Sequence, residues 1–258
     1  MPETALKHFR EDIGRARAII RHADPLPNVG IDEAMLRSDL LRSAWMFTVG
    51  AIDAYFSDAY ADVIAATAMS KQREPAITLP ESIQSIRVPI RAVLETYDIR
   101  DWRWRMAARA LVDSTNFLSL ETIQKSFNPF FRKGQRFFGD KLDGWIKHPK
   151  SKIRLFGVST PSYLALDAAG QDKARKEVVK DQFHERFKDI FQRRHDCIHN
   201  CDRPRLKPQP LAKKATVERV VQDAEFLVER CDEHINAEFR HFLSGCGASS
   251  LTINQVGY

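Results

Sequence analysis

Apolar residues recur along most of the chain at intervals of three and four positions, which is the spacing of an amphipathic α-helix. The spacing predicts a first helix from Glu3 to His22, ended by the turn sequence DPLPNVG. A second helix begins at Asp32 and continues to about Ser70. Two rows of apolar residues run along this second helix, so we expect it to pack on more than one side and to lie at the centre of the fold.

The middle of the chain is less regular, because prolines divide it into short pieces. We expect this segment to elaborate a core that is formed elsewhere. Its predicted helices are Glu81–Tyr97, Trp102–Val112, Leu120–Phe127 and Phe131–Ile146.

Two strong helical patterns lie in the last third of the chain. The first runs from Gln171 to about Asn200 and is stopped by the sequence NCDRPRLKPQP. The second, from Thr216 to Leu243, has the clearest helical period of all. We expect residues 245–258 to form a loose tail.

These elements predict the fold class. We expect one all-α domain over 1–258, built as a helical bundle. Residues 32–70 and 171–244 form its core, and residues 71–170 are laid over that core.

Composition fits a globular protein, with 43% hydrophobic and 29% charged residues. Lys and Arg number 40 against 34 Asp and Glu, a net charge of +6 that permits a polyanionic partner without requiring one. The four cysteines lie in the last quarter and do not form a disulfide scaffold. No apolar signal core and no bilayer-spanning stretch are visible, so we expect a cytoplasmic protein without a membrane partner.

The segment KDQFHERFKDIFQRRHDCIHNCDR contains the residues that point to chemistry. One helical stripe is apolar and comprises Phe183, Phe187, Ile190, Phe191 and Ile198. Arg194 falls in the middle of this stripe, and His195 and His199 lie along one flank, four residues apart. A guanidinium in an apolar row is costly unless it is paired or faces a site. The alternative is that the helix frays before Arg194, or that the arginine stem packs while its head reaches water.

The hexapeptide Arg194-His195-Asp196-Cys197-Ile198-His199 resembles the R-x4-6-H signature of the HEPN superfamily (higher eukaryotes and prokaryotes nucleotide-binding domains). In that superfamily the signature ends a late helix, with a polar residue after the arginine and often Asn after the histidine. His195 and Asn200 match both preferences.

The long second helix, with LLRSAWMFTVGAIDAYFSDAY, also resembles the first core helix of this superfamily. It is most similar to the RiboL-PSP-type HEPN branch, in which an acidic residue is followed by an aromatic one. Asp53 and Tyr55 match that pair. The resemblance covers roughly residues 32–70 and 171–244.

The resemblance implies an endoribonuclease that needs no metal or cofactor and acts as a toxin or an anti-phage defence effector. Its RNA substrate supplies the nucleophile, a 2′-hydroxyl, and the products are a 2′,3′-cyclic phosphate and a 5′-hydroxyl. His199 is then the general acid or base and Arg194 holds the phosphate. His195 or Asn200 orients the substrate or the catalytic ring, and Asp53 is a supporting residue.

The resemblance also implies a homodimer in which two such motifs line one composite active site, and toxins of this kind often have an antitoxin protein as a partner. Five residues turn a helix through about 140°. Arg194 and His199 therefore do not share one face, and either the length of the arginine or the partner subunit has to bring them together.

Other interpretations remain open at this point. A non-catalytic HEPN-like module would bind nucleotides or a partner protein and use Arg194 only structurally, in an ion pair with an acidic residue of the second helix such as Asp53, Asp58 or Asp62.

Metal binding and cysteine chemistry are further alternatives. The residues His195, Cys197, His199 and Cys201 suggest a zinc site, although Cys197 points away from the histidines in a continuous helix. Nothing around either cysteine matches a nucleophile motif. Basic and aromatic residues mix in the middle segment, where core packing is favoured over RNA stacking.

Overall fold

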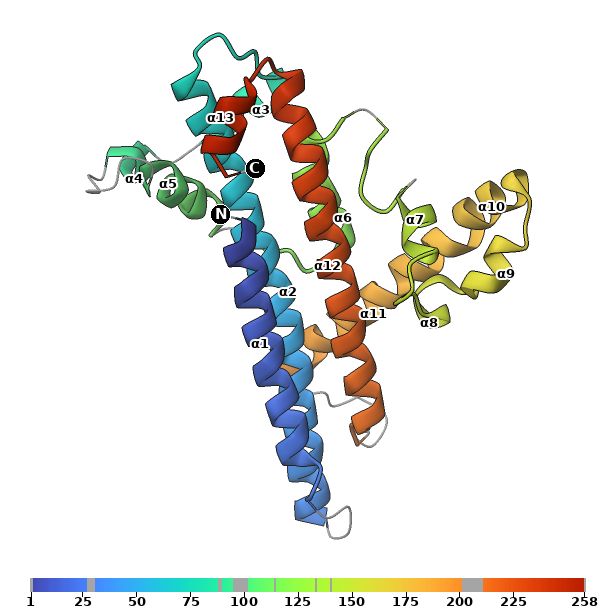
Figure 1. Ribbon diagram of the computed structural model, residues 1–258. Coiled ribbons are helices and arrows are strands. Elements are labelled where there is room, and N and C mark those ends of the chain that lie inside the picture. The colour runs from blue at the N-terminus through green and yellow to red at the C-terminus, as the bar shows by residue number, and fades with distance from the viewer. Residues whose placement is uncertain are drawn as a thin grey trace.

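The long helix α2, Ile31–Arg73, lies at the centre of the computed structural model (Figure 1). It contacts α1, Pro2–Ala23, along its length, and also packs against the C-terminal helix α12, Lys214–Gly245. The structure describes the ranges 2–26, 31–87, 90–94, 102–113, 115–132, 134–139, 141–200 and 211–257. Most apolar residues of α2 are buried on more than one side of the helix, among them Leu41 and Phe56, whereas Leu36 and Phe47 are exposed.

Two helices of the middle segment have the bounds that the sequence predicts, α5 at Trp102–Val112 and α6 at Leu120–Phe127. The predicted helix over 81–97 is wrong. Only α3, Glu81–Gln84, and α4, Ile90–Leu94, are helical there, and residues 88–89 and 95–100 lie outside the described residues. The sequence opposes one continuous helix here, because the proline at position 89 disfavours a helical conformation of the residue before it and cannot donate a helical hydrogen bond.

The predicted helix over 131–146 is also wrong, since α7, Leu142–Ile146, is the only α-helix among the residues described in that range. A 3₁₀ turn, η1, covers Asn128–Phe130, and the backbone then enters the left-handed region at Gly134 (φ 86°) and Phe138 (φ 54°). Such backbone angles are incompatible with a continuing right-handed helix.

Aromatic side chains of this irregular segment form part of the hydrophobic core. Phe130, Phe131, Phe137 and Phe138 are all buried. Packing in the core is therefore their observed role, in agreement with the expectation for the middle segment.

A small lobe comes next in the chain and projects from α12 on the side away from α1 (Figure 1). Its helices are α8 at Ile153–Phe156, α9 at Thr160–Leu164 and α10 at Ala168–Ala174. One π turn, η2 at Arg175–Val179, joins α10 to α11 at Lys180–Asn200. The predicted helix over 171–200 is thus present, with a wide turn near its start.

The tail, expected to be loose, is ordered. It forms α13, Ser250–Gln255, which begins at the capping side chain of Ser249. The backbone N–H of Ser249 donates to Oε2 of Glu74 at 2.9 Å, and Ile253 and Val256 are buried. A few apolar residues in a short segment are enough to anchor it, but they are too few to produce a clear helical period.

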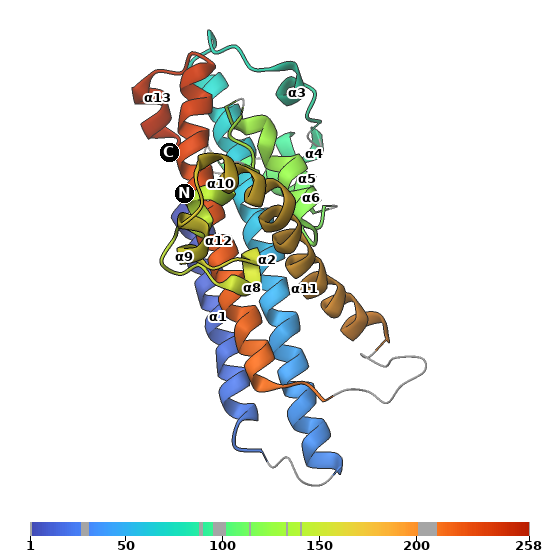
Figure 2. The ribbon, with the colours of Figure 1, turned by 90° about the vertical axis from the view of Figure 1, so that its right-hand side faces the viewer.

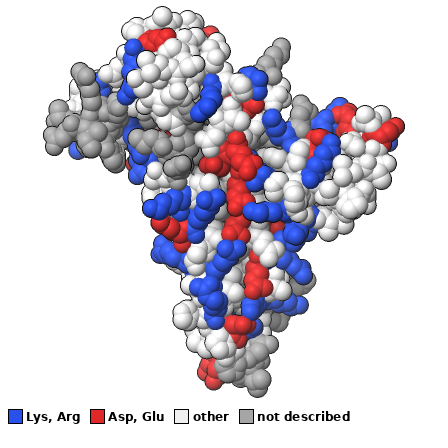
Figure 3. Space-filling view, viewed as in Figure 1, with Lys and Arg blue, Asp and Glu red and all other residues white. Residues whose placement is uncertain are grey.

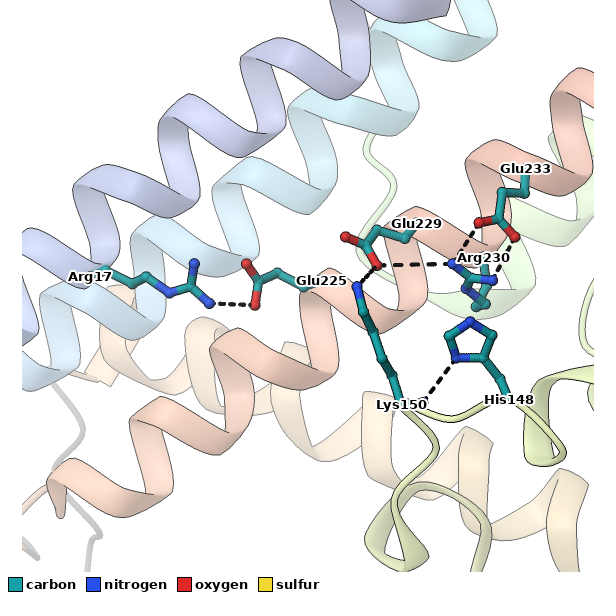
Figure 4. A network of polar contacts seen from close by, with 7 residues as sticks. All are labelled: Arg17, His148, Lys150, Glu225, Glu229, Arg230 and Glu233. Atoms are coloured by element: carbon teal, nitrogen blue, oxygen red, sulfur yellow. Dashed lines mark hydrogen bonds and ion pairs between the residues drawn. The ribbon is translucent and has the colours of Figure 1, made fainter. Parts of the chain in front are cut away.

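Ion pairs tie α12 to its neighbours. Glu225 accepts a hydrogen bond from Arg17 of α1 at 2.6 Å, and Glu229 accepts one from Lys150 at 2.7 Å (Figure 4). Figure 3 shows the acidic side chains of this face in a column, with Lys and Arg on both sides. The charges are therefore matched locally, and this face is not a basic surface.

All regular elements within the described ranges are helices, which confirms the all-α class. Among the described helices, none combines the length and the apolar character that crossing a bilayer requires.

Candidate active site

Helix α11 is anchored in its first half and leaves the bundle in its second half. Phe183, Phe187 and Ile190 are fully buried. The indole N–H of Trp45, on α2, donates to the carbonyl oxygen of Ile190 at 3.0 Å. Beyond this bond, α11 runs away from α2 toward its C-terminal end (Figure 2), and Ile198 is 46% exposed. The apolar stripe therefore stops being a core stripe before Ile198.

A cleft of about 650 Å³ opens along α11, from His184 to His199. Its opposite wall is the segment 116–121, which leads into α6. Arg194, His195 and His199 all line this cleft. The structure thus brings together the arginine and both histidines that the sequence singled out.

The two histidines lie one helical turn apart on the exposed side of α11. Their ring centroids are 4.3 Å apart, with an angle of 41° between the ring planes. Both side chains are exposed and Arg194 is half-buried. Within the described part of the chain, the guanidinium of Arg194 has no hydrogen bond or ion pair, so it is available to an anion in the cleft.

The acidic residues considered as structural partners of Arg194 are engaged elsewhere. Asp58 binds Arg109 at 2.6 Å and Asp62 binds Arg105 at 2.9 Å, both arginines belonging to α5. The structure therefore contradicts an ion pair between Arg194 and either of these carboxylates.

Asp53 lies outside the cleft and supports its wall. Its Oδ1 accepts a hydrogen bond from the backbone N–H of Phe117 at 2.6 Å. Asn116 and Leu118, on either side of Phe117, line the cleft. Asp53 therefore fixes the backbone of the wall and does not touch the motif.

Asn200, the remaining predicted site residue, is the last residue of α11, and its side chain lies outside the described residues.

A single chain brings Arg194 and His199 into the same cleft although five residues separate them on the helix. Both side chains therefore border one cleft within a single chain. The homodimer that the resemblance implies, and that we favour as the explanation of how they act together, stays a prediction.

Sequence reasoning did not identify other residues of the cleft. His184 and Lys188 line it on α11, and Glu121 lines it on α6. Nδ1 of His184 lies 3.5 Å from Oε1 of Glu121. The sequence pattern could have identified His184 and Lys188. Together with His195 and His199 they follow a helical spacing along one flank of the apolar stripe.

The side of α11 opposite the cleft faces another pocket, of about 480 Å³, between α11, α2 and the start of α12. Arg193, Asp196 and Cys197 line it. Cys197 therefore points away from the two histidines, as expected for a continuous helix. Among the residues that the structure describes, no three His, Cys, Asp or Glu side chains are grouped as metal ligands, and Cys201 lies outside them.

No protein-family model, no curated protein and no solved structure matches this chain.

Proposed function

We propose that this protein is a metal-independent endoribonuclease of the HEPN type, which cuts RNA by attack of a 2′-hydroxyl on the adjacent phosphate. One observation carries the proposal: the guanidinium of Arg194, which has no hydrogen bond or ion pair to any described residue, shares an open cleft with the imidazoles of His195 and His199. The motif resemblance gives this arrangement a reaction.

The residue types suit each step of the reaction. His199 takes the proton of the 2′-hydroxyl while O2′ forms a bond to phosphorus. The bond between phosphorus and O5′ breaks, and His195, whose ring lies beside that of His199, delivers a proton to the leaving oxygen. The products are a 2′,3′-cyclic phosphate and a 5′-hydroxyl. No bond to the protein forms at any step.

Arg194 stabilises the charge that grows on the non-bridging phosphate oxygens. Its fork of N–H donors is permanently charged and matches two oxygens of one phosphate. Removal of a preorganised donor of this kind lowers kcat by about 10²–10³. Loss of a general acid or base costs about 10²–10⁴.

The biological setting is also part of the proposal. A cytoplasmic ribonuclease without a cofactor suits a toxin or an anti-phage defence effector, kept inactive by an antitoxin protein until needed.

We propose a homodimer in which the clefts of two chains face each other, which light scattering would detect as twice the 29.6 kDa chain mass.

The test is cleavage of end-labelled single-stranded RNA in buffer containing EDTA. Arg194→Ala and His199→Ala should each reduce cleavage at least about 100-fold. Arg193→Ala is the matched control, since Arg193 lines the pocket on the other side of α11 and its loss should leave most of the cleavage intact. Circular dichroism melting establishes that all variants are folded.

Full activity of folded Arg194→Ala and His199→Ala would refute the assignment of these residues. Binding of RNA or nucleotides without any cleavage would instead identify a non-catalytic binding module. A product that carries a 3′-hydroxyl would exclude attack by the 2′-hydroxyl.

A further inference from the structure

The two ends of the cleft beside α11 differ in charge. Arg194, His195 and His199 form the basic end. At the other end the carboxylates of Glu121 and Glu185 lie among His184 and Lys188. A phosphate suits the basic end, whereas a carboxylate suits a part of the substrate that donates hydrogen bonds.

Glu121 is the more available of the two carboxylates. Its side chain is 74% exposed, and its Oε1 lies 3.5 Å from Nδ1 of His184. A carboxylate has about four lone-pair sites, so acceptor capacity remains beside its bonds to His184, Ser119 and its own backbone N–H. Hydrogen bonding to its own backbone N–H, in the first turn of α6, lowers the pKa of Glu121, so the group is ionised at neutral pH. Glu185, by contrast, binds Lys188 at 3.1 Å on the same helix.

The distance between the two ends fits a short stretch of nucleic acid. His184, which lies against Glu121, precedes Arg194 by ten residues on α11, or roughly 15 Å at 1.5 Å per residue. A group bound at Glu121 therefore belongs to a nucleotide near the scissile phosphate and not to the reacting one.

Resting on the proposed ribonuclease function, we infer that Glu121 reads a guanine base of single-stranded RNA near the cleavage site. Guanine presents two neighbouring donors, N1–H and the N2 amino group, which match the two oxygens of a carboxylate. Adenine and cytosine present one amino group beside a ring acceptor. Uracil presents its N3–H between two carbonyl oxygens, which a carboxylate repels. The edge concerned is used in base pairing, so the base must be unpaired.

The test compares short RNA strands that are uridine throughout except for one guanine, adenine or cytosine placed near the cut. With His199→Ala as a non-cleaving background, fluorescence anisotropy should show about tenfold or tighter binding of the guanine strand over the all-uridine strand. Adding Glu121→Gln should reduce this preference to less than about threefold, because an amide offers one acceptor in place of two. Glu81→Gln, an exposed glutamate of α3 outside the cleft, is the matched control and should keep the preference.

The outcomes separate the two proposals. Equal affinity for the guanine and uridine strands, or a guanine preference that survives Glu121→Gln, overturns the role of Glu121 even if the protein cleaves RNA. A guanine preference that depends on Glu121 in a protein that never cleaves RNA supports the base-reading role and refutes the nuclease.

Discussion

His234 of α12 should make the stability of the fold depend on pH. It is 6% exposed and packs against the rings of both Phe131 and Phe137, at centroid distances of 4.7 and 5.1 Å. Its Nε2 donates to the carbonyl oxygen of Gln135 at 3.0 Å, which fixes the neutral tautomer. Burial lowers the pKa of His234 from 6.5 to about 4.

The sign of the effect is set by these values. As pH falls from 7 to 5, His234 becomes protonated in the unfolded chain but stays neutral in the folded protein. The unfolded state therefore binds more protons, and the free energy of unfolding falls. A shift from 6.5 to about 4 bounds the total loss at about 3 kcal/mol, of which about 2 kcal/mol is lost between pH 7 and pH 5.

The assay is urea unfolding of the wild type and His234→Gln at pH 7 and at pH 5. Glutamine keeps an N–H donor near the position of Nε2 but does not titrate. We expect the wild type to lose about 2 kcal/mol more than the variant between the two pH values. Other groups, such as Asp62, whose pKa burial raises to about 6, change the free energy of unfolding with pH by the same amount in both proteins. His241→Gln, at an exposed position of the same helix, should behave as the wild type.

An equal loss of stability in the wild type and in His234→Gln would refute the reasoning, because the titration would then come from other groups.

Three further substitutions test the supports of the site and the tail. Trp45→Phe removes the hydrogen bond to Ile190 and should cost about 1 kcal/mol in urea unfolding while lowering the rate of RNA cleavage severalfold; an unchanged rate would show that this anchor does not position the motif. Asp53→Ala leaves the N–H of Phe117 without its acceptor and should lower the free energy of unfolding by about 1–3 kcal/mol, whereas unaltered stability would mean that water replaces the carboxylate. Ile253→Asp buries a charge and should lower the melting temperature clearly; wild-type melting would contradict the packing of α13.

The long helices were predictable because their apolar faces repeat over many turns. α1, α2, α11 and α12 each have enough turns for the period to emerge, and the shorter α6 begins at the capping side chain of Ser119. The segment 131–141 was mispredicted as helix, because its aromatic residues are as frequent as those of a buried helix. Its course is set by tertiary contacts, such as the bidentate pair of Arg132 and Glu238 at 2.8 Å, which no local pattern reveals.

The candidate site was predictable in part for a similar reason. Arg194 stood out because it interrupts an apolar row, and the structure places it in a cleft with both histidines. The role of Asp53 at the backbone of Phe117 depends on a partner 64 residues away. The opposite wall of the cleft, with Glu121, is likewise fixed only when α6 and α11 come together.

The π turn between α10 and α11 has a consequence for how this chain tolerates changes in length. Such a turn holds one residue more than an α-helical turn, so it rotates the preceding helix by about 100° relative to the helix after it. Buried Phe183 and Phe187 hold α11 in place, which leaves α10 as the element that turns. Deletion of the exposed Val178 would therefore rotate α10, and α9 with it, about the axis of α11. Arg194 and His199 would keep their positions relative to the buried residues of α11.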